Sequence, residues 1–249
     1  MGIFDLFGSP STREDAARRK LARRLTERYG PPENRQKAID QLGRERTAGS
    51  LETLCLRFTI HSEPGITDQE EKELALGHLL EAGRDAIAPV TAFLQKHEAG
   101  VSWGLQALAG VATSEEVVAI TVAELARLAT VYTRDPEKKL TLLAWLAEHH
   151  PGAASDALEP AVVALLEDFS DDVRIRATRL LALRAPSEPI RVALLELLVR
   201  DAGNARVRGE VLTALATHQA DVAGYRPRVE PLIAEPWFLD REGRVKKRG

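Results

Sequence analysis

Six histidines and one cysteine are the residues best suited to metal binding or nucleophilic chemistry in this chain of 249 residues. No His-Glu-x-x-His pair occurs, and a single cysteine cannot build a zinc cluster. His149 and His150 come just before Pro151, where a cation at a helix end favours the helix dipole. Cys55 lies in an apolar run, which is typical of a buried thiol. We therefore predict no metal, no cofactor and no cysteine nucleophile.

Paired carboxylates are a second source of chemistry, because two neighbouring acids can act as general acid and base. The pairs Glu70-Glu71, Glu115-Glu116 and Asp171-Asp172 lie near expected helix starts, where a carboxylate accepts unpaired backbone N–H groups. Neither a glycine-rich phosphate loop nor a Gly-x-Ser-x-Gly sequence is present. We expect a protein that is not an enzyme, although serine, histidine and acidic residues from distant positions could still meet in the folded chain.

Basic residues near the N-terminus are the most suggestive binding feature. The sequence Ser11-Thr12-Arg13-Glu14 matches a capping box, and Ala17, Leu21, Leu25 and Tyr29 then follow at spacings of four along one helical stripe. The other side of this expected helix carries the predicted partner-binding cations, which are Arg19, Lys20, Arg23, Arg24 and Arg28. Residues 1–32, with an apolar start, also provide a helix that could simply cap the repeats described below.

The opposite end of the chain, residues 235–249, combines aromatic and basic residues. Trp237 and Phe238 precede a basic stretch that runs from Arg244 to Arg248. We expect the two aromatic rings to cover the last repeat and Trp237 to be a further partner-binding residue. The tail is poor in apolar residues, so it is predicted to be disordered.

An internal repeat organises the sequence between these two ends. A basic residue is followed after three positions by a small or apolar residue and after four more by leucine, which marks one face of a helix. Such starts occur on average about every 35 residues. The copies are Arg35-Ala38-Leu42, Lys72-Ala75-Leu79, Lys139-Leu142-Leu146, Arg174-Ala177-Leu181, Arg208-Val211-Leu215 and the degenerate, glycine-rich Val101-Gly104-Leu108.

A second apolar segment follows each of these helices, so the repeating unit is a pair of helices. Pro89, Pro160 and Pro231 fall near the start of the second helix, where a missing N–H costs little. The composition agrees, with 44% hydrophobic residues, only 5% aromatic residues and no lasting strand-like alternation. Because one such pair cannot bury its apolar face alone, neighbouring pairs must stack.

Arg-x-x-Ala helices that alternate with proline-bearing helices resemble HEAT repeats, and Asp171-Asp172-Val173-Arg174 is the clearest match. The resemblance covers residues 33–234 and implies an all-α superhelix, a solenoid of about six helical hairpins. The period is shorter than is usual in that family. The tetratricopeptide pattern, which has a similar length, is missing from all six units.

The resemblance implies a non-catalytic scaffold or adaptor that binds an unidentified protein on its curved surface, whose concave face the second helices would line. DNA-repair proteins of HEAT-like fold suggest nucleic-acid binding instead, with Trp103, Trp145 and Trp237 able to stack on bases. However, residues 51–200 hold 14 Lys/Arg and 23 Asp/Glu, which opposes phosphate binding. A third alternative is peripheral membrane attachment through the N-terminal helix. One cysteine and no long apolar run favour the cytoplasm, and the oligomeric state stays open.

Overall fold

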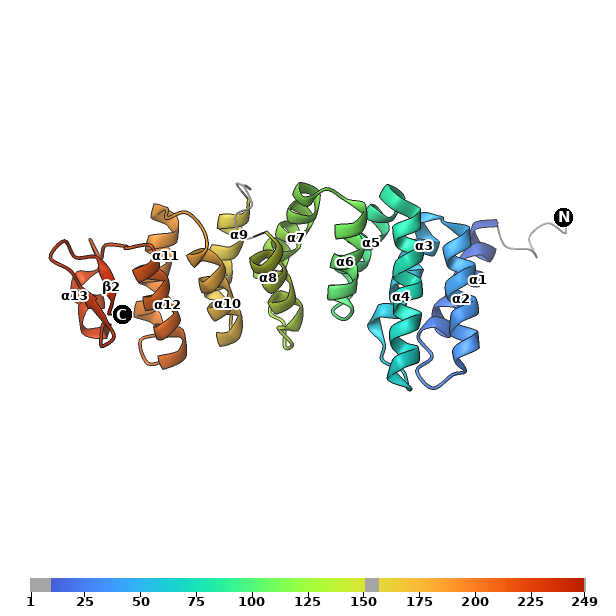
Figure 1. Cartoon of the computed structure of the whole chain (residues 1–249), viewed down its shortest axis with the longest axis horizontal. Helices are drawn as coiled ribbons and strands as arrows, with labels where there is room; N and C mark the ends of the chain where they lie inside the picture. Colours follow the sequence, from blue (N-terminus) through green and yellow to red (C-terminus); the bar gives the residue numbers. More distant parts are fainter. Residues whose placement is uncertain (1–9, 151–156, 249) are drawn as a thin grey trace, which may run out of the picture. The chain divides into compact units, whose positions relative to one another are not determined.

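A computed structural model of the chain describes residues 10–150 and 157–248 (Figure 1). Within them the fold is all-α, as predicted, apart from one short β-hairpin. The chain divides into two compact units, Met1–Val117 and Val118–Gly249. Helix α7 (Ser114–Ala129) begins in the first unit and ends in the second. Each unit has its own set of packed helices.

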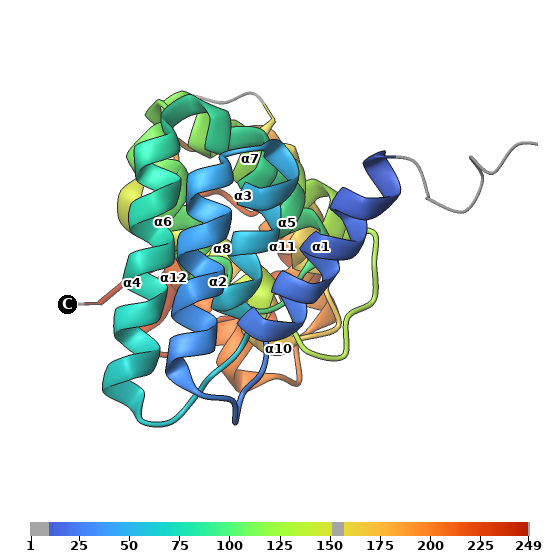
Figure 2. The ribbon, with the colours of Figure 1, turned by 90° about the vertical axis from the view of Figure 1, so that its right-hand side faces the viewer.

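Unit 1 is built from two layers of helices. Helix α2 contacts α4 and α4 contacts α6 in one layer, while α3 contacts α5 in the other (Figure 2). Helix α1 packs on α2 and α3. The bounds are α1 (Pro10–Leu25), α2 (Pro32–Glu45), α3 (Ala48–Leu54), α4 (Gly65–Ala82), α5 (Ile87–Lys96) and α6 (Val101–Val111), with 3-10 turns η2 (Cys55–Thr59) and η3 (Gly83–Ala86).

Unit 2 repeats this arrangement. Helix α10 contacts both α8 and α12, and α11 contacts both α9 and α13. The bounds are α8 (Glu137–His149), α9 (Leu158–Ala164), α10 (Asp171–Ala182), α11 (Glu188–Arg200), α12 (Ala205–Thr217) and α13 (Arg226–Val229), with 3-10 turns η4 (Leu165–Glu167) and η5 (Glu230–Leu232). Strands β1 (Trp237–Leu239) and β2 (Val245–Lys247) form an antiparallel hairpin that contacts α12.

All six repeat starts predicted from the sequence lie in helices, namely α2, α4, α6, α8, α10 and α12. The leucine that ends the pattern has no exposed surface in any copy, so the stripe faces the core as its spacing predicts. These leucines are Leu42, Leu79, Leu108, Leu146, Leu181 and Leu215. The local spacing therefore identifies both the helix and its buried face.

Polar caps define several of the helix starts. The side chains of Thr47, Ser170, Ser187 and Asn204 each accept the backbone N–H of the residue three positions later, at α3, α10, α11 and α12. At α10 the capping group is thus Ser170 rather than the carboxylates that follow it, which the sequence had suggested as caps. These short polar side chains cap the helices and fix where each of them begins.

The glycines of the degenerate third copy allow close packing around α6. Gly100 has a φ of 78°, and a Cβ at this position would come within 2.7 Å of the Cβ of Phe58. A Cβ at Gly104 would come within 2.8 Å of the Leu94 side chain. The repeat pattern is weak here because small residues are required where α6 meets its neighbours.

Both ends of the chain differ from what the sequence predicts. Helix α1 begins at Pro10, so the backbone of Ser11 lies within the helix rather than before it. It ends at Leu25, so Arg28 and Tyr29 lie in the turn before α2 and not on the helix. The prediction of a disordered C-terminal tail is also wrong in part, because β2 pairs with β1 and Val245 is fully buried. Backbone pairing with β1 and contact with α12 order this tail despite its low apolar content.

Leu181 tests the register of the stripe. Replacing it with alanine should lower the free energy of unfolding by about 2–5 kcal/mol, because the side chain is fully buried in α10. Leu183, two residues later, is 55% exposed, and the same replacement there should change stability by less than about 0.5 kcal/mol. Urea denaturation of the two variants measures the difference, and equal losses would contradict the register.

Candidate functional site

Metal and thiol chemistry find no support among the described side chains. No group of three or more His, Cys, Asp or Glu residues in the part of the chain that the structure describes could hold a metal ion. Cys55 has no exposed surface, and its burial raises the pKa of the thiol far above its ordinary value. The predicted buried thiol is therefore confirmed. A thiol in this state cannot act as a nucleophile at neutral pH.

A buried charge network occupies the start of the first layer in unit 1. We give this name to Arg35, Arg57, Asp68, Glu71 and Lys72, all at most 7% exposed. Oε2 of Glu71 accepts two hydrogen bonds of 2.8 Å, one from Nε of Arg35 on α2 and one from Nε of Arg57 on η2. The prediction that Glu71 caps a helix is therefore wrong. Its carboxylate joins α2, η2 and α4 instead.

Asp68 is the second carboxylate of the network. It accepts hydrogen bonds from Lys72 at 2.7 Å, from Arg57 at 2.6 Å and from the backbone N–H of Ser62 at 2.9 Å. Burial by itself would raise its pKa, but the bonds from Lys72 and Arg57 outweigh that effect and hold the pKa well below its ordinary range. The group is therefore an ionised structural anion and not a general acid.

Ser62, His61 and Asp68 come together, but they do not form a catalytic triad. Ser62 donates its hydroxyl proton to Asp68 at 3.1 Å and accepts a bond from Arg57 at 3.0 Å. Nδ1 of His61 lies 3.1 Å from the other oxygen of the same carboxylate. Nucleophilic catalysis needs the histidine to take the serine proton. Here Ser62 and His61 both contact the carboxylate of Asp68 instead, and Ser62 is buried.

Similar contacts recur at the repeat starts of unit 2. Lys139, which is 2% exposed, donates to Asp168 at 2.7 Å and to the backbone oxygen of Val131 at 3.0 Å. Arg174 lies 2.8 Å from a carboxylate oxygen of Asp201, directly after the second helix of the same hairpin. The basic residue that defines the sequence repeat is thus a structural cation in these copies. It contacts an acid that follows the second helix of its own hairpin.

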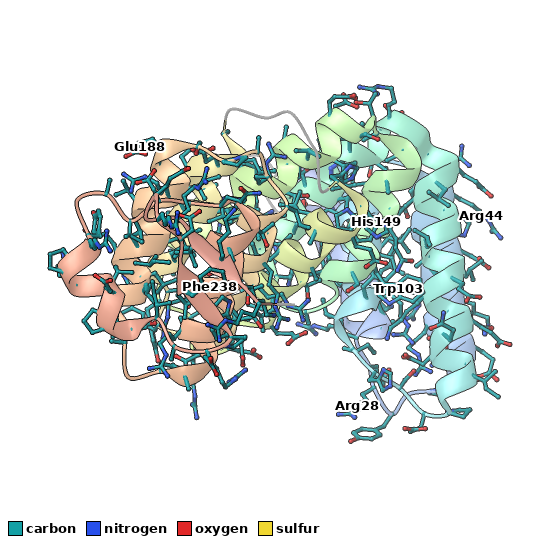
Figure 3. The ribbon with its side chains drawn as sticks, turned by 60° about the vertical axis from the view of Figure 1, so that its left-hand side comes forward. Arg28, Arg44, Trp103, His149, Glu188 and Phe238 are labelled. Carbon is teal, nitrogen blue, oxygen red and sulfur yellow. The ribbon has the colours of Figure 1, made fainter. Side chains whose placement is uncertain are left out.

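The cations predicted to bind a partner are solvent-exposed. Leu21 and Leu25 of α1 are 4% and 0% exposed, so two of the four predicted stripe residues pack against unit 1. Tyr29, by contrast, is 90% exposed beside Arg28, whose guanidinium carbon lies 5.7 Å from the ring centre. Figure 3 shows Arg28 projecting from the turn, away from the helices of unit 1. The exposed cations are Arg19, Lys20, Arg23, Arg24 and Arg28.

Each tryptophan contacts side chains of its own unit. Trp103 stacks on Phe58 with ring centres 5.5 Å apart, and Trp145 lies 4.0 Å from the ring of His149. Trp237 lies against α12, where a Cβ at Gly209 would be 3.8 Å from its ring. Lys247 covers the same ring at 5.7 Å. The first two rings are thus already stacked, and Trp237 lies against α12, whereas Phe238, which was also expected to cover the last repeat, is 37% exposed.

A groove on unit 2 lies outside the sites predicted from the sequence. It encloses about 410 Å³ and crosses α8, α10 and α12. We call it the arginine groove, and its lining residues are Leu140, Asp172, Ile175, Arg176, Arg179, Arg206 and Glu210. On α10 the contributing positions follow helical spacings of three and four, so they share one face. That face is opposite the leucine stripe and is therefore available to a ligand.

Two ion pairs hold most of the charged side chains in the groove. Arg179 on α10 donates Nε to Glu210 on α12 at 3.0 Å, and Arg206 on α12 donates to Asp172 on α10 at 2.7 Å. The hydrogen bond from Arg179 lowers the pKa of Glu210. Arg176 is exposed, and its side chain makes no hydrogen bond or ion pair with any described residue. The groove therefore offers one free guanidinium between two fixed ones.

A sequence signal for this groove exists, but it is spread over two repeats. Arg176 and Arg179 follow the repeat start Arg174, while Arg206 precedes the next start, Arg208. The repeat pattern selects residues on the buried face and ignores those on the opposite face. Aligning the exposed positions of successive copies would have brought these cations together.

Comparisons with known protein families, curated proteins and solved structures find no match to this chain. Among the described helices, none is long and apolar enough to cross a bilayer. Any conclusion about function therefore comes from the surfaces described above.

Acidification tests the buried charge network. The folded-state pKa of Asp68 lies below its unfolded value of about 3.9, so its contribution is present above that value and is lost as the pH falls through the folded pKa. Asp68→Asn should lower the free energy of unfolding at pH 7 by about 3–5 kcal/mol, because Arg57 and Lys72 lose a buried counter-charge. Guanidinium denaturation at pH 7 and at pH 3 measures the loss of stability in Asp68→Asn and the loss of the Asp68 contribution in acid.

The control is Asp85→Asn, which changes an exposed carboxylate of the same unit. It should leave both the stability at pH 7 and its fall in acid close to those of the parent chain. If Asp68→Asn behaved in the same way, the network would not support unit 1.

Proposed function

We propose that this chain is a non-catalytic protein-binding scaffold, built as a HEAT-like solenoid, that holds an acidic segment of a partner protein in the arginine groove. Support for the solenoid comes from the regular repeat and from the alternate helices that contact one another within each unit. A cytoplasmic location is part of the proposal, since a lone cysteine suits a reducing compartment. The first layer of helices, which carries the groove, is then the binding face in unit 2.

The arginine groove is the observation that carries this proposal. Guanidinium groups present paired N–H donors that match the two oxygens of a carboxylate. Arg176 is unpaired and can donate to such a carboxylate, whereas Arg179 and Arg206 already donate to Glu210 and Asp172. A ligand that meets fixed cations loses less side-chain freedom on binding. The groove thus favours carboxylates that arrive at a defined spacing.

The remaining lining residues favour a protein segment over a nucleic acid. Leu140 is half-buried and Ile175 is 6% exposed, so the groove has a small apolar surface for an aliphatic side chain, mainly at Leu140. Asp172 and Glu210 interrupt the cations of the groove, whereas a run of phosphates needs an uninterrupted basic track. An acidic peptide with interspersed leucine or valine residues can use both the cations and the apolar surface.

Charge reversal at Arg176 tests the proposal directly. Arg176→Glu should weaken binding of a fluorescent peptide of alternating Glu and Leu residues by about 10-fold or more, because a charge-assisted hydrogen bond contributes about 1.5–3 kcal/mol. The melting temperature should stay the same, since this side chain is exposed and has no described partner. Fluorescence anisotropy at two salt concentrations measures the affinity.

Arg134→Glu is the matched control, because it reverses an exposed cation of unit 2 that does not line the groove. It should leave peptide binding within about twofold of the parent chain. Equal losses for the two variants would indicate unspecific attraction and contradict the proposal. Tighter binding of duplex DNA than of the peptide would favour the nucleic-acid alternative.

A further inference from the structure

We propose that α1 and the turn after it form an electrostatic docking face for an anionic lipid bilayer. This face belongs to unit 1, and the proposal does not depend on the groove of unit 2. It concerns the cations that the sequence singled out and that the folded chain leaves exposed: Arg19, Lys20, Arg23, Arg24 and Arg28.

These cations are exposed and are not neutralised by other described residues. Their side chains form no hydrogen bond or ion pair within the part of the chain that the structure describes. Glu27 is the single acid between Arg19 and Arg28 in the sequence. By comparison, Arg18 on the same helix is paired with Asp15. The unpaired cations therefore form a local excess of positive charge on a protein whose net charge is −3.

The cations of α1 lie on the side of the helix that faces away from unit 1. Residues 19, 20, 23 and 24 lie at spacings of one, four and five, which places them on one side of α1. Leu21 and Leu25 point the other way and are buried against unit 1. An amphipathic helix that enters a bilayer needs a free apolar stripe. Since this stripe is occupied, α1 docks through its charges while it stays packed on the unit.

The chain around α1 favours a bilayer over an acidic protein or a nucleic acid. Just before α1, residues 1–9 contain one charged residue, Asp5, and the large apolar residues Met1, Ile3, Phe4, Leu6 and Phe7. Stable attachment to a membrane surface generally takes two signals, such as a polybasic patch and a hydrophobic group. A nucleic acid would gain little from these apolar side chains. A lipid surface can bind both the cations of α1 and the apolar residues before it, which lie within 30 residues of one another.

Tyr29 is a second feature that favours a lipid bilayer. Its ring is 90% exposed and lies beside Arg28 in the turn that follows the cations. Aromatic side chains with one polar end are enriched at the boundary between headgroups and hydrocarbon. An exposed tyrosine at the edge of a basic face therefore fits a lipid headgroup layer better than bulk water.

Vesicle binding of the full-length chain provides the test. Phosphatidylcholine vesicles with phosphatidylglycerol should bind the protein and pure phosphatidylcholine vesicles should not, with binding reduced by added salt. Arg23→Gln with Arg24→Gln should weaken binding by about 25-fold, at about fivefold for each cation near an anionic surface. Arg134→Gln with Arg241→Gln removes the same charge from exposed sites of unit 2 and should bind like the parent chain. Co-sedimentation gives the partition coefficients, and circular dichroism verifies that each variant is folded.

The apolar signal is tested separately by Phe4→Ser with Phe7→Ser. This variant should bind less at every salt concentration while keeping the salt dependence, because its cations are unchanged. Parent-like binding of this variant or of Arg23→Gln with Arg24→Gln would overturn the proposal. Equal binding to neutral vesicles, or tighter binding to polyglutamate or duplex DNA than to anionic vesicles, would also overturn it. Arg176→Glu should leave vesicle binding unchanged, so failure here and failure of the acidic-peptide proposal are distinguishable.

Discussion

The Glu71 carboxylate, shared by the guanidinium groups of Arg35 and Arg57, is the contact on which the first hairpins of unit 1 depend. All three side chains are at most 1% exposed, so each charge has left water and needs its partners. A shift of α4 by one residue along α2 would separate the carboxylate from Arg35 and leave that buried guanidinium without its acid. Apolar side chains tolerate such a shift better, because leucine contacts are not directional. The network therefore sets the register in which the leucine stripes of neighbouring helices meet.

The same reasoning explains why the basic residue of the repeat is a better guide to helix pairing than the leucines are. Lys139 and Arg174 each contact an acid that follows the second helix of their own hairpin, and Arg35 contacts an acid of the next hairpin, 36 positions away. A sequence predicts the helix that carries such a cation, because spacings of three and four are local. It does not predict the acid, because the loop lengths between helices vary and many carboxylates are in range. For that reason Glu71 could be mistaken for a helix cap while the stripe beside it was predicted correctly.

Other differences between expectation and structure have the same cause. The predicted stripe on α1 extends through Tyr29, but the helix ends at Leu25 and the turn that follows leads into α2. The β-hairpin that orders the C-terminal tail depends on backbone pairing and on α12, neither of which appears in the composition. The arginine groove needs side chains from three helices, so a search along one helix finds only part of it. Local patterns thus predict the elements, whereas surfaces built by stacking follow from the register.

The arginine groove and the cationic side of α1 differ in whether their charges are paired with acids, and this difference affects what each can bind. Arg179 and Arg206 bridge α10 and α12 through their acids, so a ligand must compete with these pairs or use the free guanidinium of Arg176. Such a site gains selectivity and loses affinity, because part of its charge is already neutralised. The cations of α1 have no such partners, and their long side chains can adapt to a surface without fixed spacing. Paired arginines suit a segment with defined geometry, whereas unpaired ones suit a fluid layer of headgroups. Since α1 packs on unit 1 through Leu21 and Leu25, binding a bilayer through its charged side would not require the helix to leave the unit.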